Sequence, residues 1–294
     1  MSGRIVEVSS PAALSYHDRQ LVVARAGEPE ARVPLDDLGV LVLDYAQATA
    51  TVPLLAACAA GNVAVVVCDG RHMPAGLLAP FAANTLHART LREQIAVGEP
   101  RRKRLWQAVV VAKIGEQSRL LRDLLGDDGR VGGLAPFVRS GDPDNVEARA
   151  ARIYFERLFG EMFVRDRAAA GLNAMLNYGY AVVRAAVARA VVGAGLHPAL
   201  GIHHHNQYDA FSLADDLMEP LRPLVDARAH AYGREHEPPE ELTPQAKRAM
   251  LGALGEEVSF DGKRYPMMAA LELYAARVRA CLLGEGRKLA CPGR

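Results

Sequence analysis

The spacing of apolar residues changes once along this chain, and that change constrains the fold more than any other feature. Up to about residue 75, apolar and β-branched residues form short runs bounded by Gly, Asp and Pro, at 4–8, 20–24, 40–44 and 63–68. From about residue 84 onward they recur at spacings near 3.6, the period of an α-helix. The pattern predicts an α+β protein in which a small β domain precedes a larger, all-helical domain.

Breaks in the pattern indicate where these domains should meet. Asp69-Gly70 and Met73-Pro74 interrupt the strands. We therefore expect a β-sandwich-like domain over residues 1–75, a linker over 76–85 and a helical domain over 86–294. The clearest expected helices cover 53–60, 149–169, 174–192, 212–221 and 267–283, and the polar, Pro-rich stretch 234–246 predicts a loop.

Composition narrows the function only a little. The chain has 294 residues and half of them are apolar, which is enough for two domains with a substantial core. The net charge of +1 does not indicate nucleic-acid binding, so any DNA contact needs basic residues gathered locally. The four cysteines form no CxxC pair and predict no zinc site. Without a signal peptide or an apolar run of membrane-spanning length, we expect a cytoplasmic protein with no membrane partner.

Two polar motifs stand out in the helical part. Glu147 follows a Gly-Asp-Pro-Asp turn at an expected helix start, where it could be a ligand or simply a charge that favours the helix N-terminus. Three consecutive histidines, 203–205, lie in an expected extended segment, so His204 should face away from His203 and His205. A neutral imidazole is a common metal ligand. Loop histidines without a ligand are the alternative.

A third motif places two carboxylates on one helical face. Asp216 and Glu219 are three residues apart, and Arg222 continues the same face. The two like charges need a positive partner, which could be Arg222 or a metal ion; a solvated acidic turn is the alternative. Carboxylates with one imidazole suit Mg²⁺ or Mn²⁺, and such ions suit phosphodiester chemistry.

Basic residues gather in one stretch. Residues 89–122 carry nine Arg or Lys against three acidic residues. The cluster Arg101, Arg102, Lys103 and Arg104 precedes Trp106, the only tryptophan, and could contact phosphates. An ordinary exposed helix start, with Trp106 in the core, is the alternative.

Taken together, four segments resemble the CRISPR-associated integrase, the universal catalytic subunit of spacer acquisition, in its type II-like version. The segments are 142–155, 176–184, 199–206 and 213–223. The resemblance implies an N-terminal β domain, through which the chain forms a homodimer, and a C-terminal helical domain. It also implies a heterohexamer with a small ferredoxin-like partner, which holds a short DNA duplex with 3′ overhangs and inserts it beside the CRISPR leader.

The resemblance also implies the site residues. The family's metal ligands correspond to Glu147, His204 and Glu219, with Asp216 as a supporting acidic residue. The family phrase, Gly, two residues and then His, selects His204; His205 remains possible.

The implied reaction is attack of a DNA 3′-hydroxyl on a phosphodiester of the repeat, with Mg²⁺ or Mn²⁺ as cofactor and without ATP. The absence of a GxxxxGK[ST] loop agrees with this. Tyr178 could stack on a DNA end, or lie in the core, and Arg222 could contact DNA. A free-standing metal-dependent nuclease and a non-catalytic DNA-binding scaffold are the competing functions.

Overall fold

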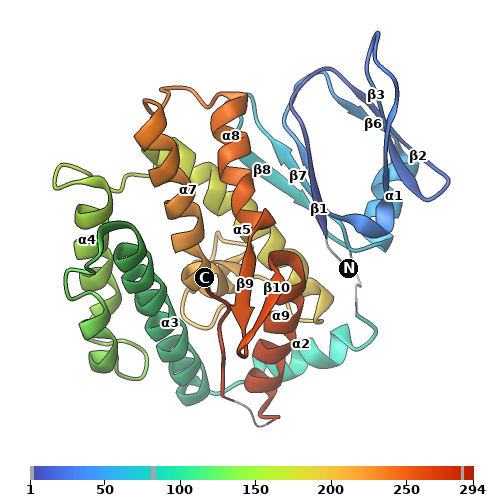
Figure 1. Ribbon diagram of the computed structural model, residues 1–294. Coiled ribbons are helices and arrows are strands. Elements are labelled where there is room, and N and C mark those ends of the chain that lie inside the picture. Colours follow the sequence, from blue (N-terminus) through green and yellow to red (C-terminus); the bar gives the residue numbers. More distant parts are fainter. Residues whose placement is uncertain (1–2, 81–83, 286–287) are drawn as a thin grey trace.

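The protein has a strand-rich N-terminal part and a larger helical C-terminal part, as the periodicity predicts (Figure 1). The structure is a computed structural model, and it describes residues 3–80, 84–285 and 288–294. The N-terminal part lies at the upper right of Figure 1 and contacts one side of the helical part. In the described part of the chain, no helix is both long and apolar enough to cross a membrane.

The N-terminal part consists of two four-stranded sheets. The first has the order β1 (Arg4–Val8), β5 (Leu38–Leu43), β7 (Ala64–Cys68) and β8 (Pro74–Leu78). The second has the order β4 (Ala31–Pro34), β3 (Gln20–Ala24), β2 (Ala13–His17) and β6 (Thr49–Ala50). An apolar core that includes Leu14, Leu21, Leu41 and Val65 joins the sheets, together with α1 (Val52–Ala60). The arrangement is sandwich-like, as expected.

The strand β5 and residues 64–66 of β7 are buried on both faces. Leu41 and Val65 point into the core between the two sheets, whereas Val40 and Val66 belong to the core of the helical part. Parallel strands covered on both faces carry continuous apolar runs, which explains why these two segments are the clearest strands in the sequence. The two parts of the chain therefore pack through a shared layer of side chains.

The helical part is arranged around two long helices, α3 (Glu99–Leu125) and α5 (Leu172–Gly193). The surrounding helices are α2 (His87–Ile95), α4 (Val146–Phe159), α6 (Ser212–Met218), α7 (Arg222–Glu235), α8 (Pro244–Leu251) and α9 (Met267–Leu283). A 3₁₀ turn, Glu219–Leu221, connects α6 to α7. A Cβ atom at Gly179 would lie 2.4 Å from Cγ1 of Val225, so only glycine allows α5 and α7 to approach this closely.

Several elements differ from those predicted. The helix expected over 149–169 ends at Phe159, because Gly160 has a φ of 96° that stops it. The part expected to be all-helical also contains a hairpin, β9 (Glu257–Phe260) with β10 (Lys263–Pro266). Its turn is Asp261-Gly262, with positive φ at both residues, a typical hairpin signal that the helical periodicity obscured.

Short strands were also missed in the N-terminal part, namely β2, β4, β6 and β8. Because β8 ends at Leu78, strand structure continues into the expected linker 76–85. Within that linker, 81–83 lie outside the described residues. The domain boundaries at 75 and 86 stay a prediction.

Candidate active site

Glu147, His204 and Glu219 line the same cavity, although they are far apart in the sequence. The cavity has a volume of about 670 Å³ and its wall includes residues of α3, α4, α5 and α7. Trp106, Lys113, Arg222 and Asp226 also line it. A concave site with converging polar groups is the usual form of an active site.

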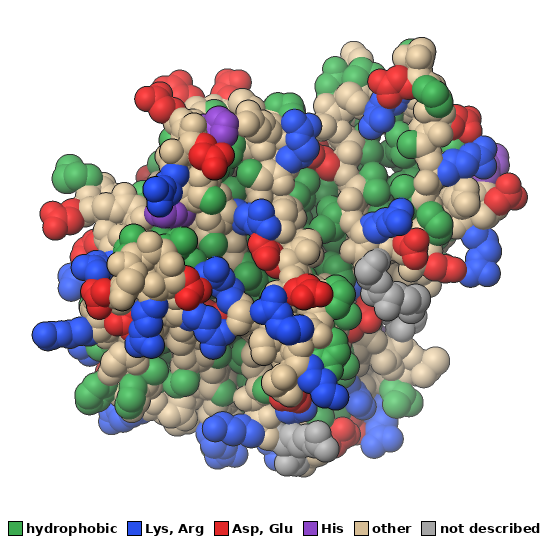
Figure 2. Space-filling view, in the orientation of Figure 1, with side chains coloured by type: hydrophobic (Ala, Val, Ile, Leu, Met, Phe, Trp, Pro, Cys, Tyr) green, Lys and Arg blue, Asp and Glu red, His purple; other side chains and the backbone are tan. Residues whose placement is uncertain are grey.

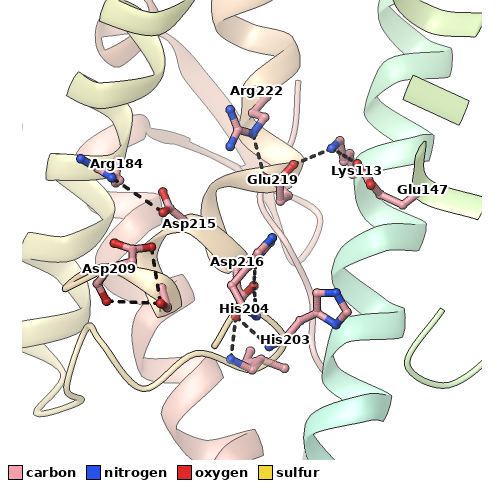
Figure 3. A network of polar contacts seen from close by, with 12 residues as sticks. Lys113, Glu147, Arg184, His203, His204, Asp209, Asp215, Asp216, Glu219 and Arg222 are labelled. Carbon is pink, nitrogen blue, oxygen red and sulfur yellow. Dashed lines mark hydrogen bonds and ion pairs between the residues drawn. The ribbon is translucent and has the colours of Figure 1, made fainter. Parts of the chain in front are cut away.

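Glu147 is held at the start of α4 by a cap. The Asp142 carboxylate accepts hydrogen bonds from the backbone N–H of Val146 (2.9 Å) and of Glu147 (3.0 Å). This cap fixes the first turn of the helix, and the Glu147 side chain extends from it toward α3. There its carboxylate accepts a hydrogen bond from the ammonium group of Lys113 (Figure 3).

Glu219 lies at the junction of α6 and α7, where it is buried between two cations (Figure 3). Oε2 accepts a hydrogen bond from Lys113 Nζ at 2.5 Å, and Oε1 accepts one from Arg222 Nε at 2.8 Å. Burial alone would raise the pKa of Glu219, but Arg222 and Lys113 outweigh burial and lower this pKa to about 2. Glu219 is therefore ionised at neutral pH.

Asp216 organises the histidine loop. Its buried carboxylate accepts hydrogen bonds from the backbone N–H groups of Ile202 (2.6 Å), His203 (2.9 Å) and His204 (3.3 Å). A Cβ atom at Gly201 would lie 2.3 Å from the carbonyl oxygen of His204, so this tight loop requires glycine.

The same carboxylate orients the His204 ring. Asp216 Oδ1 lies 2.6 Å from His204 Nδ1, and this hydrogen bond raises the pKa of His204. A carboxylate that holds one ring nitrogen leaves Nε2 as the atom that can bind an ion, which is the usual arrangement behind a metal-ligating histidine.

Trp106 supports this loop from α3. Its ring stacks on His203, with 4.3 Å between centroids and 3° between planes, and it contacts the edge of His204 at 5.7 Å. Trp106 is buried. Trp106 therefore does not act with the basic cluster as a phosphate contact. It packs in the interior, beside the candidate ligand His204.

The three candidate ligands suit a divalent ion by type, since carboxylate oxygens with one imidazole are preferred by Mg²⁺ and Mn²⁺. The Lys113 ammonium group already lies between Glu147 and Glu219 and pairs with both. Among the described residues, however, no three His, Cys, Asp or Glu side chains are close enough together to hold a metal. An ion would need space that Lys113 now fills.

Tyr178 does not lie where a DNA end could reach it, so the stacking interpretation is wrong. The side chain is fully buried, and its hydroxyl group lies 3.5 Å from Glu7 Oε1. Tyr180, two residues later, lines the cavity instead. Arg222 also lines it, with its guanidinium 4.4 Å from the centre of the Tyr180 ring.

The predicted basic cluster is separate from the cavity. Arg101 donates to the carbonyl oxygen of Leu282 at 2.9 Å, and Lys103 pairs with Glu99 at 2.8 Å. Arg102 and Arg104 are on the same first turns of α3. Lys113 lies eleven positions after Arg102, or about 16 Å along a helix. Figure 2 shows basic and acidic side chains interspersed on the face in view, without a broad patch of one sign.

Three further arginines line the cavity: Arg152, Arg165 and Arg167. Arg152 lies on the face of α4 that also carries Glu147, Ala148 and Ala151, so helical spacing from Glu147 could have indicated it. Arg165 and Arg167 belong to the loop between α4 and α5, where no local periodicity marks a cavity residue. These guanidinium groups, rather than Arg101 and Arg104, are near the candidate ligands.

Asp226 forms a buried polar group at the inner wall of the cavity. It accepts hydrogen bonds from the hydroxyl groups of Tyr154 (2.7 Å) and Tyr180. Burial raises the pKa of Asp226 from 3.8 to about 6, although both tyrosines oppose this rise. The ionised form of this carboxyl group is therefore less favourable in the folded chain than in the unfolded one.

This raised pKa predicts a pH-dependent stability. Between pH 3.8 and about 6 the folded chain binds more protons at Asp226 than the unfolded chain does, so the contribution of Asp226 to stability falls as the pH rises. Relative to Asp226→Asn, the free energy of unfolding of the wild type should drop by on the order of 2 kcal/mol across this window. Urea unfolding at several pH values measures the difference. If the free energy of unfolding changed with pH in the same way for both proteins, the prediction would be contradicted.

Comparison with known proteins identifies relatives over almost the whole chain. The family model described as CRISPR associated protein Cas1 matches residues 6–138 and 144–249. The chain is 36% identical over 291 residues to the CRISPR-associated endonuclease Cas1 of Neisseria meningitidis serogroup C (strain 8013), which covers 98% of this chain and 95% of that protein.

Solved structures share the fold at low sequence identity. A casposase bound to integration product has a TM-score of 0.78 and 19% identity, with 98% of this chain and 92% of that chain covered. A Cas6–RT–Cas1–Cas2 complex has a TM-score of 0.74 and 17% identity, with 97% of this chain and 35% of that chain covered. The arrangement of a strand-rich part followed by a helical part is therefore not peculiar to this sequence.

Proposed function

Because the chain belongs to the Cas1 family of CRISPR-associated proteins, we propose that it inserts short DNA duplexes into a CRISPR array by metal-dependent phosphodiester exchange. Glu147, His204 and Glu219 are the proposed ligands of Mg²⁺ or Mn²⁺. The observation that carries the proposal is their convergence on one cavity beside three arginines. The resemblance to a casposase bound to integration product agrees with it at the level of the fold.

In the proposed reaction, the 3′-hydroxyl of the incoming duplex attacks a phosphorus atom of the repeat. A new phosphodiester bond forms as the bond to the departing 3′-oxygen breaks; the attacking hydroxyl loses a proton and the departing oxygen gains one. One phosphodiester replaces another, so no ATP is needed. When bound, the metal ion supplies a Lewis acid that stabilises charge on the phosphoryl oxygens. With water as the attacking group, the same site cleaves DNA.

The residues of the chain have distinct parts in this proposal. Glu219 stays ionised because Lys113 and Arg222 lower its pKa. Asp216 fixes the His204 ring through Nδ1. The guanidinium groups of Arg152, Arg165 and Arg167 are placed to bind phosphates that enter the cavity.

The proposed assembly is the one that the resemblance of the sequence implies. We propose that the chain works in the cytoplasm, as a homodimer formed through residues 1–75, with residues 86–294 as the catalytic domain. A small ferredoxin-like protein is the proposed partner in a heterohexamer on DNA. The solved Cas6–RT–Cas1–Cas2 complex, in which part of one chain shares the fold of this chain, agrees with a protein partner in general.

A joining assay tests the function. The purified protein, with its partner, is incubated with Mn²⁺ or Mg²⁺, a labelled duplex with 3′-hydroxyl overhangs and a supercoiled plasmid that carries the repeat. We expect labelled plasmid with the wild type, and at least about 100-fold less with Glu147→Ala or His204→Ala. His205→Ala is the matched control, because His205 is exposed in the same loop, and it should join DNA normally.

A duplex with 3′-deoxy ends separates joining from cleavage. It should give no labelled plasmid while leaving plasmid nicking intact. Nicking without joining by the wild type would favour a free-standing nuclease. Equal joining by wild type and Glu147→Ala would remove the proposed site.

A further inference from the structure

Lys113 is unusual among the cations of α3 because its side chain is only 9% exposed. Lysines are seldom buried unless they are paired. The Lys113 ammonium group donates to Glu147 and, at 2.5 Å, to Glu219, so it connects α4 to the junction of α6 and α7 (Figure 3). Lys103, on the same helix, instead forms an exposed pair with Glu99.

The charges around Lys113 leave little room for another cation. Glu219 uses Oε1 for Arg222 and Oε2 for Lys113, so both of its oxygen atoms already face a positive group. Arg222 is bound to Glu219 at the far side from Glu147, whereas Lys113 lies between the two glutamates (Figure 3). The group that an ion shared by Glu147 and Glu219 must replace is therefore Lys113, and Arg222 can keep its bond.

We propose that Lys113 is a built-in counterion, which holds Glu147 and Glu219 together in the metal-free protein and competes with the divalent ion for the space between them. This inference rests on the proposed function, since it assumes that both glutamates bind the ion. Without Lys113, the carboxylate of the buried Glu219 and that of the partly exposed Glu147 would repel each other and the site would open. With Lys113 in place, metal binding costs the separation of a buried ion pair.

Competition by Lys113 also couples metal binding to DNA binding. Once displaced, the ammonium group lies at the cavity wall without its carboxylates, and a DNA phosphate there can pair with it. DNA should therefore strengthen metal binding in the wild type, and by reciprocity the metal should strengthen DNA binding. In a variant without the Lys113 charge, DNA should no longer strengthen metal binding through this residue.

Calorimetric titration with Mn²⁺ tests the inference without any measurement of activity. We compare the wild type with Lys113→Met, and with Lys103→Met as the matched control from the exposed end of α3. Lys113→Met should bind Mn²⁺ at least about tenfold more tightly than the wild type, because a nearby positive charge has been removed. Lys103→Met should bind Mn²⁺ with the same affinity as the wild type. A short duplex should raise Mn²⁺ affinity in the wild type and not in Lys113→Met.

Thermal unfolding provides the second measurement. Without metal, Lys113→Met should have a lower melting temperature than the wild type. Added Mn²⁺ should raise the melting temperature of Lys113→Met by more than it raises that of the wild type. If Lys113→Met does not fold, Lys113→Gln replaces it, because glutamine keeps a hydrogen-bond donor without the charge. Equal or weaker Mn²⁺ binding by the neutral variants would overturn the inference and leave the proposed function standing. No Mn²⁺ binding by any of these proteins, the wild type included, would remove both.

Discussion

Glu219→Gln is expected to abolish DNA joining and to lower the free energy of unfolding by about 3–5 kcal/mol. The Glu219 carboxylate balances two cations at once, Lys113 and Arg222, in a buried position. Glutamine has nearly the same size, but it leaves Arg222 without the carboxylate that it pairs with, leaves Lys113 with Glu147 alone, and points an amide N–H toward a cation. Urea unfolding followed by circular dichroism measures the stability, and the joining assay measures the activity.

Glu147→Gln is the informative comparison, because Glu147 should matter for chemistry and little for stability. Its side chain is 24% exposed and it pairs with Lys113, which Glu219 also neutralises. We expect joining to be lost while the free energy of unfolding falls by about 1 kcal/mol or less. Equal losses of stability in the two variants, or joining by Glu219→Gln, would contradict the roles assigned to these residues.

Local sequence was enough to locate the main elements and the candidate ligands. The strands β5 and β7 are visible because burial on both faces makes them continuous apolar runs. Glu147 is visible because it follows a Gly-Asp-Pro-Asp turn at an expected helix start, and Asp142 of that turn does accept hydrogen bonds from the first turn of α4. Elements with weaker local patterns were missed: β2, β4, β6 and β8 are short, and the Asp261-Gly262 hairpin lies between helical segments.

The partners of the ligands could not be read from the sequence, because they come from distant segments. Asp216 and Glu219 were expected to share one positive partner on a helical face. In the structure α6 ends at Met218 and a 3₁₀ turn follows, so Glu219 faces Lys113 and Arg222 while Asp216 faces the histidine loop. Lys113 is 34 residues from Glu147 and 106 from Glu219. Nothing local distinguishes it from an ordinary helix-surface lysine.

Asp216→Asn is the second substitution with a large expected effect, although we do not place Asp216 among the ligands. The Asp216 carboxylate accepts hydrogen bonds at both oxygen atoms, from three backbone N–H groups and from His204 Nδ1. Asparagine replaces one oxygen with an N–H₂ group, which would then face other donors. We expect the free energy of unfolding to fall by about 2–4 kcal/mol, and joining to fall about 10–100-fold because the His204 ring loses its orientation.

Trp106 makes it possible to tell loss of loop order from a change in chemistry alone. Because Trp106 is the only tryptophan and stacks on His203, its fluorescence reports the conformation of the loop that Asp216 holds. Asp216→Asn should change the emission of the folded protein. Asp215→Asn is the matched control on α6, since Asp215 faces Arg184 at 3.7 Å, and it should keep both the emission and the joining activity. If Asp216→Asn keeps normal emission and joins DNA normally, the loop does not depend on this carboxylate. The orientation of His204 must then come from its edge contact with Trp106 and the close approach at Gly201.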